Sequence, residues 1–282
     1  MLNSLKRFLN QRQAPTAGAI IMGTTKLLRK TTPQPRPSIV FTLAHRRSTL
    51  GHQFQETTSL QAFYRLSSSS LPIGGYSYSQ ALEAAVSEKR VLNTSDLQSW
   101  ISSALNLWAT SDAMIWASGY RLLQTNDLKG LTALNRLYWA SRDTAELRME
   151  TEQMGWSLIR LLNDLEWLRE EHRKCLLNLT NPTFLIAHVT GCFSREITLE
   201  NGLLSFLLSF VENQVQAGQK LLPIGQSAGQ RLISDLGPII DHCINRVLFS
   251  IEPLESGLHT AAPMHSILSA RHEFQYSRLF RS

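Results

Sequence analysis

The chain has 282 residues, of which 43% are hydrophobic and 18% are charged, a composition that excludes a wholly disordered polypeptide. The formal net charge of +6 is unevenly distributed, because nine Lys and Arg residues and no acidic residue precede Glu56. The rest of the chain has 19 basic residues (28 − 9) against all 22 acidic ones, a net charge of −3. This mild acidity argues against a body that binds nucleic acid.

The cysteines and the apolar runs indicate where in the cell the protein is located. Cys175, Cys192 and Cys243 are odd in number and widely spaced, which argues against a disulfide framework and against a structural zinc site. The most apolar run, residues 202–211, is far shorter than the roughly 20 residues of a membrane-spanning helix. We therefore predict a cytoplasmic protein without a transmembrane segment.

Residues 1–57 read as a basic N-terminal extension. They are rich in Arg, Lys, Pro and Thr and show no sustained apolar periodicity, so we predict that they are mostly disordered. Their acid-free composition is shared with organellar transit peptides, although a dispensable tail is the plainer interpretation. The folded domain is then expected to span residues 58–282.

Helical periodicity begins after the extension. Apolar residues spaced i, i+3, i+4, i+7, i+8 and i+11 predict a helix with one buried stripe over residues 97–108. A second helix is expected to begin near Asp143, which forms a capping box with Glu146, and to continue to about Arg169. Pro182 suits the first position of a helix that follows it.

The remaining elements are also predicted to be helical. Thr198 is expected to cap a strongly apolar helix, and Pro238 to begin another helix after Gly237. Strict alternation of apolar and polar residues, which is typical of strands, is scarce. We therefore predict an all-α fold, a globular bundle of roughly eight to ten helices.

The glycines near residue 225 do not form a phosphate-binding loop. Three residues separate Gly225 from Gly229 where a Walker loop has four, and Gln230 stands where that loop needs lysine. Without the lysine and the hydroxyl that follows it, the terminal phosphates and magnesium have no ligands. We predict that the chain is not an enzyme and has no cofactor of its own.

Serine and histidine chemistry is equally incomplete. Ser77 or Ser79 would serve a small helical hydrolase only with a preceding strand and a base at recognisable spacing, and the sequence shows neither. The histidines have no metal-ligand spacing, so no metal site is predicted. We expect core or boundary positions for His188 and His242. Three C-terminal histidines are expected at the surface, with transient contact to nickel as the alternative: His259, His265 and His272.

The first of two Pro/Gly segments, residues 69–79, is expected to be a loop that leads into a helix. Its Pro and Gly residues favour a tight turn, and Ser77 with Gln80 matches a capping box. A plain helix-entry turn accounts for these residues. It does not account for Tyr76 and Tyr78, which would be typical protein-binding anchors if the turn were exposed.

The second such segment, residues 220–231, repeats the pattern. It bends at Pro-Ile-Gly, and Ser227 with Gln230 is expected to cap the next helix. Free backbone N–H groups at that helix terminus favour an acidic partner group, and Lys220 and Arg231 would add to the positive field.

These two segments carry a family resemblance. LPIGGYSYSQALE (71–83) and LLPIGQSAGQRL (221–232) resemble the two signature segments of UreF, a family of urease accessory proteins. Residues 146–162 resemble the central helix of that family, and residues 270–282 resemble its terminal tail. The resemblance covers residues 60–282 in order and leaves out the basic extension.

The resemblance implies a function in the maturation of urease. UreF proteins are all-helical, tend to dimerise, and bridge the accessory protein UreD (also called UreH) to the GTPase UreG in the assembly that inserts nickel into apo-urease. It therefore implies an adaptor that regulates the GTPase, within a complex through which nickel passes.

The resemblance also implies which residues contact partners. Tyr76, Lys220 and Arg278 match positions that the family places at or near the UreG-facing surface, and Arg, Lys and Tyr suit an acidic partner. Secondary candidates for partner contact come from the same two segments and the tail: Tyr78, Gln226, Gln230, Arg231, His272 and Glu273.

Two further hypotheses accompany this interpretation. The helical stripes over residues 147–165 or 199–215 would supply a homodimer face, although such stripes are more often core. The alternative function is a helical scaffold whose basic extension binds nucleic acid or an anionic membrane. With an adaptor function, neither nucleic acid nor membrane is expected as a partner.

Overall fold

The computed structural model describes residues 57–250 and 262–282, all of which belong to one compact unit, Ser48–Ser282. The predicted extension, residues 1–57, lies almost wholly outside the described residues, and so does His259. The disorder of the extension and the surface position of His259 therefore remain predictions.

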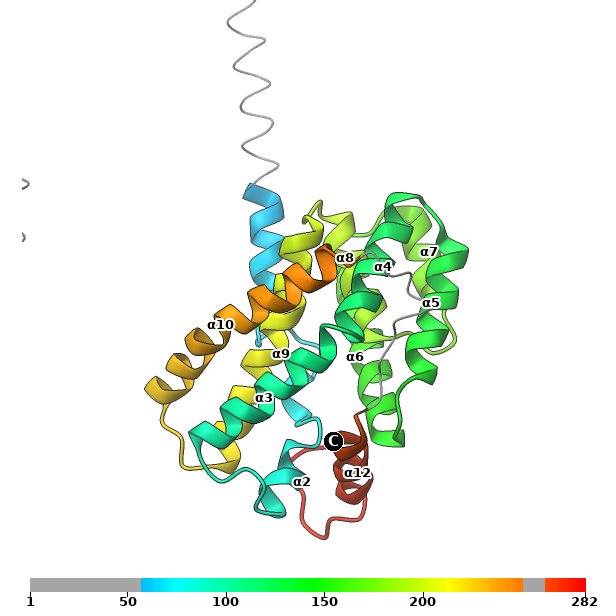
Figure 1. Ribbon diagram of the computed structural model, residues 1–282. Coiled ribbons are helices and arrows are strands. Elements are labelled where there is room, and N and C mark those ends of the chain that lie inside the picture. The colour runs from blue at the N-terminus through cyan, green and yellow to red at the C-terminus, as the bar shows by residue number, and fades with distance from the viewer. Residues whose placement is uncertain (1–56, 251–261) are drawn as a thin grey trace, which may run out of the picture. The chain divides into compact units, whose positions relative to one another are not determined.

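The described residues form helices and no strands, which confirms the predicted all-α fold (Figure 1). The first helix covers residues 57–67. It is followed by a short 3-10 turn and ten α-helices with defined ends: η2 (Gly75–Ser77), α2 (Leu82–Ser87), α3 (Thr94–Trp108), α4 (Asp112–Gln124), α5 (Leu128–Ala140), α6 (Ala145–Asp164), α7 (Glu170–Leu177), α8 (Phe184–Ser194), α9 (Leu199–Leu221), α10 (Gln226–Leu248) and α12 (Pro263–His272).

Two predicted helices, α3 and α9, are confirmed, and side-chain caps are present at their N-termini. Helix α3 buries the apolar stripe expected over residues 97–108, and the Asn93 side chain caps it by accepting a hydrogen bond from Asp96 N. Helix α9 begins after Thr198, whose hydroxyl accepts from Asn201 N, as predicted. A side chain that accepts from a free N–H group in this way is worth roughly 1 kcal/mol.

The predicted start of α6 is wrong by one residue. Thr144, and not Asp143, is the N-cap, and its hydroxyl accepts from Leu147 N at 3.2 Å. Asp143 instead accepts a hydrogen bond from Ser266 of α12. Glu146 does not complete a capping box, because its side chain points into the interior and is only 4% exposed. The helix ends at Asp164, short of the predicted Arg169.

Both predicted proline starts are wrong as well. Pro182 precedes Thr183, which caps α8, so it lies outside the first helical turn. Pro238 lies within α10, with its side chain exposed. An internal proline removes one backbone hydrogen bond, but α10 buries Leu232, Leu236 and Ile240 on both sides of it. Because packing of an apolar face supplies most helix stability in proteins, α10 continues through the proline.

The two loop segments also lack the predicted capping boxes. Gly225 occupies the N-cap of α10 without a side-chain cap, so Ser227 lies inside the first turn. Helix α2 begins after Ala81, whose φ of 67° is left-handed, and the preceding Gln80 has a φ of 50°. The side chain of Gln80 is bonded to Glu150 and is not free to cap.

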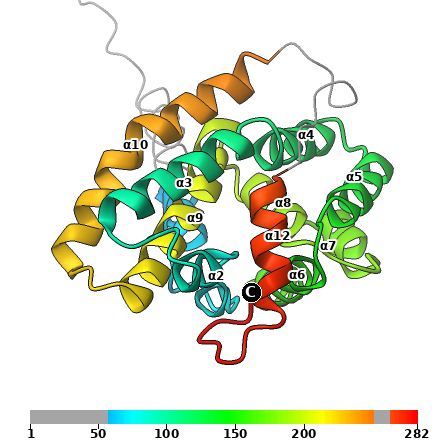
Figure 2. The same cartoon turned by 60° about the horizontal axis from the view of Figure 1, so that its bottom comes forward.

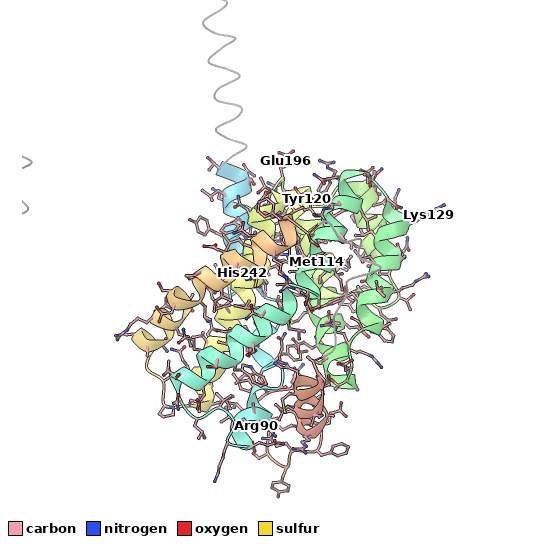
Figure 3. The ribbon with its side chains drawn as sticks, in the orientation of Figure 1. Arg90, Met114, Tyr120, Lys129, Glu196 and His242 are labelled. Atoms are coloured by element: carbon pink, nitrogen blue, oxygen red, sulfur yellow. The ribbon has the colours of Figure 1, made fainter. Side chains whose placement is uncertain are left out.

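Helix α9 lies at the centre of the bundle, in contact with α10, α3, α2, α4 and α8 (Figure 1). Trp116 of α4 is fully buried against α9, and its indole Nε1 lies 3.1 Å from His188 Nδ1 of α8. The core position of His188 is thus confirmed. His242 is exposed on α10, which corrects its expected core or boundary position (Figure 3). Among the described helices, none combines the length and apolar content that a bilayer crossing requires.

Gly155 of α6 packs against the backbone of the loop before α8. A Cβ atom at this position would lie 2.5 Å from the carbonyl oxygen of Pro182. We expect Gly155→Ala to lower the free energy of unfolding by about 1–3 kcal/mol, because a backbone atom cannot rotate away as a side chain can. Urea unfolding monitored by circular dichroism measures this change.

Gly237 is the matched control for that substitution. It also lies within a helix, α10, but a Cβ atom there would meet open space. Gly237→Ala is expected to change the free energy of unfolding by less than about 1 kcal/mol, because its gain in helix propensity is opposed by crowding between the new Cβ atom and the ring of the next residue, Pro238. Equal effects of the two substitutions would contradict the steric explanation.

Candidate functional site

The first Pro/Gly segment and the end of the chain meet next to α2 and α12 (Figure 2). Ser79 donates to the carbonyl oxygen of Ser282 from both its backbone N, at 2.7 Å, and its hydroxyl, at 2.6 Å. Arg281 N donates to Ser77 O at 2.8 Å. Ser79 is therefore a buried structural donor, and not the exposed nucleophile that a hydrolase would need.

Lys220, at the start of the second Pro/Gly segment, contacts both the first Pro/Gly segment and the end of the chain. Its Nζ donates to Tyr76 O at 3.4 Å. The ammonium group also lies 5.8 Å from the ring centroid of Tyr76 and 5.2 Å from that of Phe280. Cation–π attraction at such distances holds the lysine next to both rings.

Glu83 of α2 binds the C-terminal segment, which we define as residues 273–282, and also contacts the residue before it, His272. Its Oε1 accepts from Leu279 N at 2.7 Å, and its Oε2 accepts from Phe280 N at 2.9 Å. The same Oε2 lies 3.1 Å from Nε2 of His272, the last residue of α12. One buried carboxylate thus closes residues 273–278 into a loop.

Glu146 of α6 holds the same histidine from the other side. Its Oε2 lies 2.8 Å from His272 Nδ1, and its Oε1 accepts from Arg278 Nη1 at 2.7 Å. The His272 side chain has no exposed surface, while that of Arg278 is 40% exposed. The histidine is therefore enclosed between two carboxylates.

Glu150 lies one helical turn further along α6 and binds the last residue. Its Oε2 accepts from Ser282 Oγ, and its Oε1 accepts from Gln80 Nε2, both at 2.6 Å. Burial raises the pKa of Glu150, although the hydrogen bonds from Ser282 and Gln80 oppose that shift. We refer to Glu83, Glu146 and Glu150 together as the carboxylate cluster.

Helix α9 fixes the loop that carries this arrangement. Gln214 Nε2 donates to Ser79 O at 2.9 Å, and Asn213 Nδ2 donates to Tyr78 O at 2.9 Å. Trp100 Nε1 in turn donates to Gln214 Oε1 at 3.1 Å. Buried backbone carbonyl groups need such partners, so these two side chains determine where the loop lies.

A cavity of about 140 Å³ adjoins the cluster. Trp108, Phe206 and Phe210 line its apolar part, and Asp112 and Arg142 line a polar part. No group of three His, Cys, Asp or Glu side chains suited to a metal ion was found within residues 57–250 and 262–282.

The outer side of the C-terminal segment exposes large apolar side chains. The exposed fractions are 88% for Phe274, 63% for Leu279 and 61% for the neighbouring Tyr76, and Tyr276 is fully exposed. Three exposed cations accompany them, one in the last turn of α9 and two in the C-terminal segment: Lys220, Arg278 and Arg281. We call these seven residues the docking face. Exposed apolar clusters with a polar rim are typical of protein-binding surfaces.

The structure brings the three main predicted residues to the docking face. Tyr76 and Lys220 contact each other, and Arg278 is held by Glu146. Tyr78 is only 5% exposed and His272 is fully buried, so neither is available for direct contact with a partner while the segment is in place. The expected exposure of Tyr78 and the surface position of His272 are therefore corrected.

The other secondary candidates lie at the edge of the site or away from it. Glu273 is half-buried and directly follows the end of α12. Gln226, Gln230 and Arg231 are exposed on the first turns of α10, and they make no hydrogen bond to the C-terminal segment within the described part of the chain.

His265 also departs from its expected surface position. It is half-buried in α12 and stacks on Trp100 of α3, with ring centroids 4.3 Å apart. Burial lowers the pKa of His265 to about 4, so the ring is neutral at physiological pH.

Sequence reasoning missed the carboxylate cluster. Glu83 ends the first signature segment, and Glu146 was interpreted only as a capping residue. A partial signal was present, because Glu150 lies one turn before Met154 and two turns before the buried Leu158, beside the apolar stripe of α6. A carboxylate at a core position of an amphipathic helix requires a specific partner and is a marker of a site.

Comparison with known proteins places the chain in a family. The UreF family model matches residues 91–237. A protein from Polynucleobacter asymbioticus called urease accessory protein UreF is 40% identical over 231 residues, which cover 80% of this chain and 99% of the relative. Proteins of the same name from Cupriavidus metallidurans and Ralstonia pickettii are 38% and 35% identical, each over 79% of this chain and 97% of the relative.

The fold and the site define an all-α protein whose buried carboxylates bind a polypeptide segment and whose outer face exposes aromatic and cationic side chains beside it. The matches cover about four-fifths of the chain and nearly the whole length of the relatives. The chain belongs to the UreF family of urease accessory proteins.

Proposed function

We propose that this chain is a non-catalytic adaptor that joins UreD (UreH) to the GTPase UreG while nickel is inserted into apo-urease. The relatives' name, urease accessory protein, supports a function in urease maturation. The docking face supports the adaptor function, because it presents four large apolar side chains and three cations from segments that are fixed by buried hydrogen bonds. A prearranged surface loses little conformational entropy on binding.

The chemistry of the docking face favours UreG as the partner at this surface. A nucleotide-loaded GTPase carries phosphates and the acidic groups that hold magnesium, and exposed Lys and Arg side chains complement such charge. In this proposal the adaptor acts on the GTPase by contact, nickel is the cargo of the complex, and the assembly works in the cytoplasm.

A double substitution on the docking face tests the adaptor function. We expect Tyr76→Ala with Lys220→Ala to reduce co-purification of UreG at least about tenfold while UreD is retained, because central aromatic and cationic contacts dominate such interfaces. Arg278 is kept, since it also holds Glu146 and its loss would disturb the C-terminal segment itself.

Lys129→Ala is the control for this experiment. Lys129 is an exposed cation on α5, a helix that does not contribute to the docking face (Figure 3). The Lys129→Ala variant should still co-purify with both UreG and UreD. If the unsubstituted chain captured neither UreG nor UreD, the adaptor function would be abandoned.

We also propose homodimerisation through the outer face of α6. The predicted stripe over residues 199–215 is largely used in the core of the monomer, since Leu203, Phe206 and Leu207 are buried. Helix α6 instead exposes Met149 and Trp156, two turns apart on one side. Light scattering that showed a monomer at micromolar concentration would exclude this proposal.

A further inference from the structure

The hydrogen bonds of His272 require a positively charged ring. Both ring nitrogens face carboxylate oxygens, Nδ1 toward Glu146 at 2.8 Å and Nε2 toward Glu83 at 3.1 Å. An ionised carboxylate only accepts hydrogen bonds, whereas a neutral imidazole donates from one nitrogen and accepts at the other. With both carboxylates ionised, both ring nitrogens carry protons. No water can replace either contact from outside, because the side chain has no exposed surface.

Among the groups in direct contact with His272 and its two carboxylates, the charges balance only with that proton in place. Glu83 from α2 and Glu146 from α6 carry two negative charges, which are matched by protonated His272 and by Arg278. Deprotonation would leave one uncompensated negative charge, with the lone pair of a ring nitrogen pointing at a carboxylate oxygen. Such an arrangement is costly in a buried site.

The other charged groups nearby do not restore the balance. Arg271 on the same helix is exposed and pairs with Glu88 at the surface. Glu150 lies one turn from Glu146 on α6 and would add negative charge if ionised. Glu273, the residue after His272, is half-buried and also acidic. A neutral His272 would therefore face acidic groups from two helices, α2 and α6.

These contacts also hold the C-terminal segment. Glu83 accepts from His272 before the loop and from the backbone of Leu279 and Phe280 after it, so the same carboxylate joins histidine and segment. We propose that protonated His272 is a positioning residue that keeps residues 273–282 in place, and that loss of its second proton releases this segment together with its part of the docking face. The biological meaning rests on the proposed adaptor function, whereas the release itself is a property of the chain alone.

Hydrogen exchange in the full chain without partners tests the proposal. The amides of Leu279 and Phe280 report directly on the bonds to Glu83. After correction for intrinsic exchange rates, we expect their protection to fall at least about tenfold between about pH 6 and about pH 9. An imidazole in water is neutral at about pH 9, so release of the segment, which frees the proton held between the two carboxylates, becomes more favourable as the pH rises. Equal protection at both pH values would overturn the proposal.

Glu146→Gln makes the test specific. The amide oxygen can still accept from Arg278, and the amide N–H₂ can donate to Nδ1 of a neutral His272, whose Nε2–H continues to donate to Glu83. We expect this variant to keep the protection of Leu279 and Phe280 at about pH 9. A variant that still lost protection with rising pH would show that another group titrates, and would also overturn the proposal.

Two further variants complete the experiment. Glu88→Gln alters the exposed pair with Arg271 and should behave like the unsubstituted chain. His272→Gln removes the titrating group and should show low protection at both pH values, so a Glu146→Gln variant that failed to fold would not end the test. Unchanged protection of core amides in α9 verifies folding. Because no partner is present, failure of the adaptor function would leave these results unaffected.

Discussion

Replacing Glu83 by alanine is expected to free the C-terminal segment and to lower the free energy of unfolding by about 3–5 kcal/mol, the usual cost of breaking a buried ionic pair by removing one partner. The substitution leaves Leu279 N, Phe280 N and His272 Nε2 without their acceptor. Urea unfolding gives the energy, and hydrogen exchange of residues 273–282 shows whether the segment has become free.

Glu88 provides the comparison for Glu83. It caps the C-terminus of the same short helix, α2, but its pairs with Arg90 and Arg271 lie at the surface. The hydrogen bonds from Arg271 and Arg90 lower the pKa of Glu88, yet solvent screens such exposed pairs. Glu88→Ala should change stability little and leave the segment in place. Similar losses at both positions would show that the burial of Glu83 is not the cause.

The second large effect is expected at Asp112, the buried partner of Arg142. Asp112 Oδ1 accepts from Arg142 Nη1 at 2.9 Å and from Tyr138 Oη at 2.8 Å, while Ser111 Oγ donates to Oδ2 at 2.9 Å. Asp112→Ala is expected to cost about 3–5 kcal/mol in urea unfolding, because it leaves a largely buried guanidinium group without a carboxylate.

The buried charge of Arg142 depends on Asp112. Burial disfavours its charged form, but Asp112, with Tyr138 and Asp143, outweighs burial and raises the pKa of Arg142. Its Nε is buried and has no hydrogen-bond partner among the described residues, so Asp112 and Ser141 supply the contacts to the guanidinium group.

A double-mutant cycle separates the ionic pair from packing. Asp112→Ala with Arg142→Met removes both charges, and should cost less than Asp112→Ala alone because no buried cation is left unpaired. A double variant as unstable as the sum of the two single variants would show that the two side chains act independently.

Local sequence information was sufficient for much of the fold. The threonine cap of α9 joins residues within one helical turn, and the apolar stripe of α3 extends over about three turns. Both were predicted and are confirmed. The family resemblance also directed attention to Tyr76, Lys220 and Arg278 before their arrangement was known. Tyr76 and Lys220 do contact each other, and Arg278 lies two residues before Phe280, whose ring is next to Lys220; contact of the three residues with UreG remains a prediction.

The failures share one physical cause, which is tertiary contact. Pro238 was expected to begin a helix, but burial of both flanking stretches of α10 outweighs one lost hydrogen bond. Glu146 was expected to cap α6, but it faces His272, 126 residues away in the chain. Local patterns cannot report on partners that arrive from so far along the sequence.

The sequence by itself determined the helical class of this protein, most of its helices and its family, because periodicity, caps and signature segments act over short distances. Only the tertiary structure decided that residues 278–282 are hydrogen-bonded to Glu83, Glu146 and Glu150. It also decided that Tyr78 and His272 are buried while Tyr76 is exposed. A buried carboxylate is stable only where a distant segment supplies its donors and opposite charge, and that meeting is a property of the folded chain.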